Sequence, residues 1–218
     1  SAFYYDMSTD SPEELNSFIR ENNISSVFNL IHGIGGEDGK IQKYLDNHLS
    51  ELNDIIKFCK ENKIVLIFPS TACYFPKTGP HREDDPLFSY NLYYFSKILC
   101  EKIIQRNKSL RFIILRLFNI YGTGKNKIID YIKTNLNKKE ILLQENINLE
   151  RDFLHVDDFV NLIAKIIHSD ENKFNQIYNV ASGKSYKYVN LKKYFRKKGK
   201  KKIFSNNLKF SPPRPTVR

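Results

Sequence analysis

A tyrosine and a lysine four residues apart, Tyr93 and Lys97, point most directly to chemistry in this chain. On a helix, residues at this spacing lie on one face, so the phenol and the ammonium would be neighbours. The positive charge favours the phenolate and lowers the pKa of the tyrosine, which makes it a usable general acid or base. Tyr94 forms no such pair, because Ile98 stands four residues after it. The alternative interpretation is an exposed helical pair without function.

A pair of hydroxyl residues, Ser70 and Thr71, lies upstream at the end of an apolar segment. The continuous apolar run over 63–70 predicts a strand that is buried on both faces. Open α/β sheets bind ligands at the carboxyl ends of their strands. A hydroxyl at this place could bond the same substrate oxygen whose proton Tyr93 moves. We therefore place Ser70, with Thr71 as the second choice, in the candidate catalytic set.

The elements that must position these residues alternate along the chain. Strand patterns alternating with helical patterns predict an α/β fold with a doubly wound parallel sheet. After residue 122 the pattern loosens, so we expect a smaller domain over 123–218, interleaved with the first domain (1–122) around 150–168. The expected helices cover 11–22, 42–61, 90–105 and 127–137, and the expected strands cover 26–31, 63–70, 111–118 and 176–182, before a final basic helix.

The bulk composition is that of a globular protein, with 218 residues of which 41% are hydrophobic. No apolar run approaches the length needed to span a bilayer, and no signal-peptide pattern is visible, so we expect a cytoplasmic protein without membrane contact. The three cysteines form no Cys-x-x-Cys pair and the five histidines are scattered. This pattern predicts reduced thiols and no metal site.

The net charge of +11 comes from one end of the chain. Residues 184–218 hold 13 of the 35 basic residues and none of the 24 acidic ones. The densest run, over 192–202, could contact nucleic acid. No aromatic stacking platform or recognition motif accompanies it, so we interpret it as the solvated face of a helix.

Several segments, in this order, resemble the extended short-chain dehydrogenases/reductases, and among them the NAD-dependent nucleotide-sugar epimerases and dehydratases. The segments are PSTACYF (69–75), EDDPLFSYNLYYFSKILCE (83–101), LRLFNIYGTG (115–124), RDFLHVDDF (151–159) and YNVASG (178–183). The resemblance covers nearly the whole chain. It implies a Rossmann-type sheet, NAD as cofactor with NADP left open, and a nucleotide-diphosphate sugar as substrate. It also implies a homodimer formed through the helices over 42–61 and 90–105.

The same resemblance implies roles for individual residues. Ser70, Tyr93 and Lys97 correspond to the family's catalytic residues. The residues implied near the cofactor are Asp6, at the adenine, with Ile31, His32, Gly33 and Asn47. The residues implied at the sugar nucleotide are Asn119, with Arg151 and Arg214 at the diphosphate. We expect His155 and Asp157 to cap the helix that follows them, and Arg116 to be a structural residue between strand and helix.

The glycine-rich stretch NLIHGIGGEDGK, over 29–40, resembles a phosphate-binding loop only superficially. After Gly33 and Gly35 the dinucleotide fingerprint requires a third glycine, where this chain has Asp38. By the resemblance, this stretch is instead the family's fourth strand, and the phosphate loop would precede residue 1. We therefore expect the chain to be a fragment or a truncated product that lacks the loop and also ends early.

The expected reaction is 4-epimerisation by hydride transfer at a sugar carbon. Dehydratases of the family carry an Asp-Glu pair after the hydroxyl residue, where this chain has Thr71 and Ala72. Reduction of a 4-keto-sugar nucleotide is one alternative. Another is a degenerate, non-catalytic member that binds a partner or RNA through residues 184–202.

Overall fold

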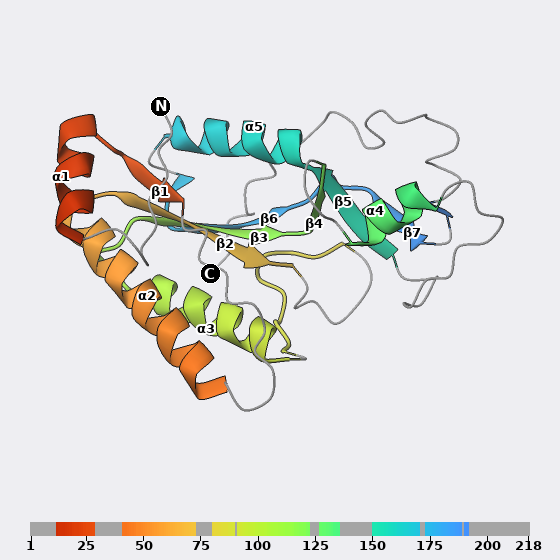
Figure 1. Ribbon diagram of the computed structural model, residues 1–218, viewed down its shortest axis with the longest axis horizontal. Helices are drawn as coiled ribbons and strands as arrows, with labels where there is room; N and C mark the ends of the chain where they lie inside the picture. Colours follow the sequence, from red (N-terminus) through yellow and green to blue (C-terminus); the bar gives the residue numbers. More distant parts are fainter. Residues whose placement is uncertain are drawn as a thin grey trace.

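The computed structural model describes residues 12–28, 41–72, 80–89, 91–122, 127–135, 150–170, 173–188 and 190–191. Within these segments the strands form a four-stranded sheet of order β1-β2-β3-β6 and a three-stranded sheet of order β4-β5-β7 (Figure 1). The helices are α1 (Pro12–Asn22), α2 (Ile41–Glu61), α3 (Leu92–Arg106), α4 (Lys127–Thr134) and α5 (Val156–Ile167). The strands are β1 (Ser26–Phe28), β2 (Val65–Thr71), β3 (Phe112–Leu117), β4 (Asn119–Tyr121), β5 (Glu150–His155), β6 (Gln176–Val180) and β7 (Ser185–Lys187).

Helices cover both faces of the four-stranded sheet, whose strands are all parallel (Figure 1). Along β2, Leu66 and Phe68 pack in one hydrophobic cluster with residues of α2 and α3. Val65 and Ile67 pack on the opposite face with residues of α5. Because successive strand residues point to opposite faces, a strand that is covered on both sides needs a continuous apolar run. The expected α/β class with a parallel sheet is confirmed.

The small sheet joins segments that are distant in sequence. β4 follows β3 almost directly and pairs in parallel with β5, while β7 pairs with β5 in the antiparallel direction. A separate cluster with α4 covers it, formed by Tyr121, Ile129, Ile132, Phe153, Tyr188 and Leu191. The sequence patterns did not indicate this sheet, because three-residue strands such as β4 and β7 are too short to show an alternation. The division into domains at residue 122 stays a prediction.

Within the described segments, no helix is long and apolar enough to cross a bilayer.

Candidate active site

Helix α3 carries Tyr93 and Lys97 against the sheet. The helix begins after Asn91, whose side-chain oxygen accepts a hydrogen bond from the Tyr94 backbone N–H at 2.9 Å. Such a cap satisfies one of the donors that every helix start leaves unpaired. The buried residues of the helix are Ser96, Lys97, Cys100, Glu101 and Ile104. Their spacing marks the face that meets the sheet, and half-buried Tyr93 lies one turn before Lys97 on that side.

The ammonium of Lys97 is held at the carboxyl end of β2. Its side chain is fully buried at 0% exposure, and Nζ donates a hydrogen bond to the carbonyl oxygen of Pro69 at 3.2 Å. Nζ also lies 4.7 Å from the ring centroid of Phe68, a cation–π contact. These contacts compensate part of the cost of removing an ammonium from water.

The backbone of β2 sets the direction in which the Pro69 carbonyl points. Leu66 N and Ala72 N donate to carbonyls of the β3 side, whereas Val65 N donates to Ser25 on the β1 side. The alternation directs the Pro69 backbone toward β1, and in the described residues β1 pairs with β2 only as far as Ile67. Proline has no N–H to donate, and its carbonyl oxygen accepts the hydrogen bond from Lys97 Nζ.

Burial lowers the pKa of the Lys97 ammonium below its ordinary value, and neighbouring Cys100 and Glu101 oppose this shift.

The two described cysteines, Cys59 and Cys100, are free and buried. Burial raises the pKa of the Cys59 thiol to about 12 and that of Cys100 to about 11. Both thiols therefore stay protonated and unreactive at neutral pH.

Ser70 and Thr71 end β2 and are both buried. Ser70 follows the alternation of Leu66 and Phe68 and so lies on the face that α3 covers. Thr71 has the parity of Val65 and Ile67, which face α5. Of the two expected hydroxyl residues, Ser70 is the one whose position in the strand places it on the side of Lys97.

A buried ion pair lies one turn after Lys97. Arg116 of β3 donates from Nη2 to Glu101 Oε2 at 2.8 Å and from Nε to Glu101 Oε1 at 3.2 Å. Its third nitrogen, Nη1, donates to the backbone carbonyl of Glu83 at 2.8 Å. Arg116 thus connects β3, helix α3 and the loop before α3. The sequence predicts only a structural residue between strand and helix.

The expected sugar-nucleotide residues Asn119 and Arg151 lie in the small sheet. Asn119 Nδ2 donates to the Asp152 carbonyl at 3.0 Å, and Arg151 Nη1 donates to the Glu150 carbonyl at 3.1 Å. The Asp152 carboxylate accepts from the backbone N–H groups of Ser182, at 2.7 Å, and Lys184, at 2.9 Å. Burial raises the pKa of Asp152, and these hydrogen bonds oppose the shift. Asn119 and Arg151 thus lie on neighbouring, paired strands of the small sheet.

The helix cap expected near His155 is present. His155 Nδ1 accepts from the backbone N–H of Asp157 at 3.2 Å, at the start of α5. The His155 ring also packs edge-on against Tyr121 of β4, with centroids 5.0 Å apart. His155 therefore has a structural role at this helix start.

Several expected residues cannot be placed. Asp6, Ile31, His32, Gly33 and Arg214 lie outside the described residues. Asn47 lies in α2, where the backbone but not its side chain is described. Their roles stay predictions. In the part of the chain that is described, no three His, Cys, Asp or Glu side chains gather as metal ligands.

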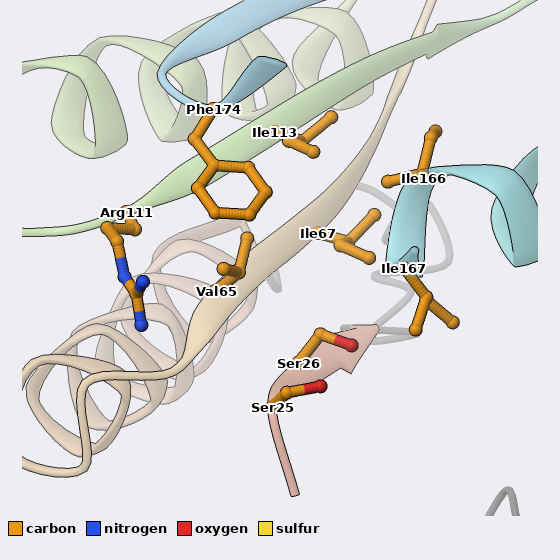
Figure 2. Close-up of a pocket in the computed structure, with 9 residues that line it drawn as sticks. All are labelled: Ser25, Ser26, Val65, Ile67, Arg111, Ile113, Ile166, Ile167 and Phe174. Carbon is orange, nitrogen blue, oxygen red and sulfur yellow. The ribbon is translucent and has the colours of Figure 1, made fainter. Parts of the chain in front are cut away.

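A pocket of about 150 Å³ lies at the opposite end of the sheet, between the amino ends of β2 and β3 and the last turn of α5 (Figure 2). Its lining is apolar apart from Ser25, Ser26 and Arg111, and it contains none of the expected catalytic residues. The expected acid–base residues lie instead at the carboxyl end of the sheet, which is the candidate site.

Sequence reasoning missed two residues of the site, Glu83 and Asn179. The Asn179 backbone N–H donates to Glu83 Oε1 at 2.8 Å, and Asn179 Nδ2 donates to the His81 carbonyl at 3.1 Å. They join segments almost a hundred residues apart, so no local pattern could reveal them. The sequence hinted at Glu83 alone, through the acidic residues that precede Pro86 in the segment 83–101.

A parallel sheet with helices on both faces is the architecture of Rossmann-type folds, which bind ligands at the carboxyl ends of their strands. The sequence model of the NAD dependent epimerase/dehydratase family matches residues 3–181, and the chain belongs to this family. It is 26% identical over 209 residues to the ADP-L-glycero-D-manno-heptose-6-epimerase of Brachyspira hyodysenteriae, covering 87% of this chain and 64% of that protein. It is 29% identical over 171 residues to an uncharacterized protein of Methanocaldococcus jannaschii, covering 72% and 52%.

Solved structures agree with this fold. The UDP-glucuronic acid 4-epimerase of Bacillus cereus, in complex with NAD, has a TM-score of 0.70 at 22% identity, over 85% of this chain and 61% of that one. The dTDP-glucose 4,6-dehydratase of Bacillus anthracis, also with NAD, has a TM-score of 0.68 at 24% identity, over 84% and 59%. The chain thus spans about 52–64% of its curated relatives and about 60% of these structures.

Proposed function

We propose that the protein carrying this chain is an NAD-dependent nucleotide-sugar epimerase that acts at the sugar's C4. The observation that carries the proposal is the buried Lys97 ammonium at the carboxyl end of β2, one helical turn after Tyr93. Family membership supports the reaction class, because family members named above are epimerases and a dehydratase.

Each residue of the set has a separate task. Tyr93 moves the proton of the sugar hydroxyl as its carbon is oxidised and reduced. The Lys97 ammonium stabilises the phenolate form of Tyr93 through its positive charge. The Ser70 hydroxyl lies on the same side of β2 and hydrogen-bonds the reacting oxygen, which fixes the sugar for proton transfer.

The donors present at this edge fit a dinucleotide. An ammonium carries three N–H donors, and the structure assigns one of those of Lys97 to Pro69. In the proposed complex a further N–H of Lys97 would donate to a ribose hydroxyl of the cofactor, which would reach it at the carboxyl end of β2. Asp6, Ile31, His32, Gly33 and Asn47 are the further residues that would hold NAD. NAD, when bound, supplies the hydride acceptor and donor for the sugar carbon.

The substrate we propose is a nucleotide-diphosphate sugar. Asn119 and Arg151, with Arg214, would hold it, since a guanidinium matches phosphate oxygens with two parallel hydrogen bonds. Helices α2 and α3 are the proposed homodimer surface. The heptose epimerase and the two solved relatives act, by their names, on ADP-, UDP- and dTDP-linked sugars, which makes these three nucleotides the first probes.

The test combines native mass spectrometry with a turnover assay. The purified protein is first examined for retained NAD, then incubated with UDP-glucose, UDP-N-acetylglucosamine, UDP-glucuronic acid, dTDP-glucose and an ADP-heptose. We expect conversion of one probe to its C4 epimer without added reductant. A 4-keto-sugar nucleotide is the separate probe for the reductase alternative: its reduction with stoichiometric consumption of NADPH, and no epimerisation of the other probes, would support that alternative. Absence of NAD binding and of all turnover would overturn the proposal in favour of a non-catalytic member.

A further inference from the structure

One guanidinium holds the chain on both sides of the Tyr93–Lys97 pair. Arg116 contacts the Glu83 carbonyl, ten residues before Tyr93, and the Glu101 carboxylate, eight residues after it. Arg116 is 3% exposed and Glu101 is 0% exposed, so water competes for neither group. The pair is bidentate, which restricts direction as well as distance.

The loop before α3 has a second anchor on the neighbouring strand. Asn179 of β6 binds the Glu83 carboxylate through its backbone N–H and the His81 carbonyl through its side chain. In the sheet register, Arg116 stands opposite Ser70 of β2 on one side and opposite Asn179 on the other. The anchors of the loop and of the helix therefore lie in the same row as the expected catalytic hydroxyl.

The other described contacts of α3 with the sheet restrict it less. Cys100 and Ile104 pack in the apolar cluster with Phe68 and Ile114, and such contacts are not directional. The Lys97–Pro69 hydrogen bond ties a flexible side chain at one point. A buried ion pair is weak evidence for stability, because desolvation offsets most of the attraction. Its geometry, rather than its contribution to folding, distinguishes the contact of Arg116 with Glu101.

We propose that Arg116 is the positioning residue of the Tyr93–Lys97 pair. By joining Glu83 and Glu101 to the end of β3, it sets where the phenol and the ammonium stand relative to Ser70 and to the bound reactants. This inference rests on the proposed function for its consequence in catalysis, but its structural part can be tested without substrate.

The test uses the whole protein and a pair replacement. Arg116→Met combined with Glu101→Leu removes both charges together, so no buried charge is left unpaired and the fold is retained. Arg111→Met is the matched control. It removes the same side chain from the residue just before β3, where the guanidinium lies over Phe174 and donates to the Lys63 carbonyl at the far end of the sheet.

Hydrogen exchange is the first readout. In the double variant we expect amides of residues 80–97 to exchange about tenfold faster or more, because the loop and the start of α3 open locally. Arg111→Met should leave this segment unchanged. A folded double variant with wild-type exchange over 80–97 would overturn the proposal, whatever substrate the enzyme uses.

Kinetics is the second readout, on the probe that the wild type converts. Displacement of the pair should lower kcat about 100-fold while KM changes only a few-fold. Arg116→Lys, which keeps the charge opposite Glu101, should retain more of kcat than the double variant. Unchanged kcat in the double variant would contradict the proposal.

Two further outcomes are decided in advance. If the double variant does not fold, Arg116→Lys replaces it in the test. We expect this variant to lose the contact with the Glu83 carbonyl while the Glu101 carboxylate stays paired. Wild-type exchange over 80–97 and wild-type kcat in Arg116→Lys would then overturn the proposal. If the wild type converts no nucleotide sugar, the proposed function fails, and hydrogen exchange alone decides whether Arg116 positions the helix.

Discussion

Lys97 Nζ lies 3.2 Å from the carbonyl oxygen of Pro69, the residue immediately before Ser70. This hydrogen bond joins helix α3 to the end of β2 at the point where the expected hydroxyl stands. The bond brings Lys97, which is 28 residues from Pro69 in the chain, to the edge at which α/β sheets bind ligands.

A Lys97 variant tests whether this side chain is needed for catalysis and whether it is needed for folding. We expect Lys97→Met to lower kcat by about 100-fold or more, because in the proposed mechanism its positive charge stabilises the phenolate of Tyr93. The fold should be retained, since methionine fills a similar volume and needs no hydrogen bond. Turnover of the identified nucleotide sugar and circular dichroism check the two parts; a variant with wild-type kcat would contradict the assignment.

The lowered pKa of Lys97 also predicts a pH dependence of stability. Between the folded-state pKa and the ordinary value of 10.5, the unfolded state binds more protons than the folded one. The free energy of unfolding contributed by this group therefore rises with pH in that window. Any advantage of Lys97→Met over wild type in urea unfolding should shrink from pH 7 toward pH 10. An advantage that grows with pH would contradict the shift.

Two adjacent tyrosines provide a matched test of the general acid–base. Tyr93 and Tyr94 pack edge-to-face at 5.6 Å between ring centroids and are both half-buried. Tyr93→Phe should lower kcat about 100- to 10,000-fold while the fold is retained, because the aromatic ring and its packing stay in place. Tyr94→Phe should change kcat less than about tenfold. Comparable losses in both variants would indicate a packing effect instead of proton transfer.

The two hydroxyls at the end of β2 should differ in effect because they face opposite sides of the sheet. Ser70→Ala should lower kcat about 100-fold, since in the proposed mechanism its hydroxyl hydrogen-bonds the reacting oxygen on the α3 side. Thr71→Val should affect stability more than kcat. Steady-state kinetics and thermal unfolding distinguish the two. A larger kcat loss in Thr71→Val would reassign the catalytic hydroxyl to Thr71.

Gly122, after β4, is required by both its backbone angle and its neighbours. Its φ is +146°, and a Cβ added there would lie 2.4 Å from Val156 Cγ1. Gly122→Ala should therefore lower the free energy of unfolding by about 2–4 kcal/mol. Gly183→Ala is the control, because its φ is +78° but nothing lies within 4 Å, so only about 1 kcal/mol of backbone strain is expected. Urea unfolding of both variants measures the difference, and equal losses would rule out the Val156 contact as the cause.

The succession of strands and helices along the chain could be predicted, because it follows from local hydrophobic periodicity. The continuous apolar run of β2 follows from burial on two faces, and the alternating strand and helix patterns follow from the helices that cover them. The placement of Tyr93 and Lys97 on one turn required only their spacing. Family membership, likewise, follows from motifs of the linear sequence.

The tertiary structure decided what depends on register and on distant contacts. Whether Ser70 or Thr71 faces α3 follows from the parity of β2 against its two layers, which residue types alone do not set. The contacts of Arg116 with Glu83 and Glu101 cross 33 and 15 residues, and those of Asn179 with His81 and Glu83 cross 98 and 96. Local patterns determined the elements, because helices and strands form from near neighbours. Packing determined the site, because its hydrogen bonds join segments that only the folded sheet brings together.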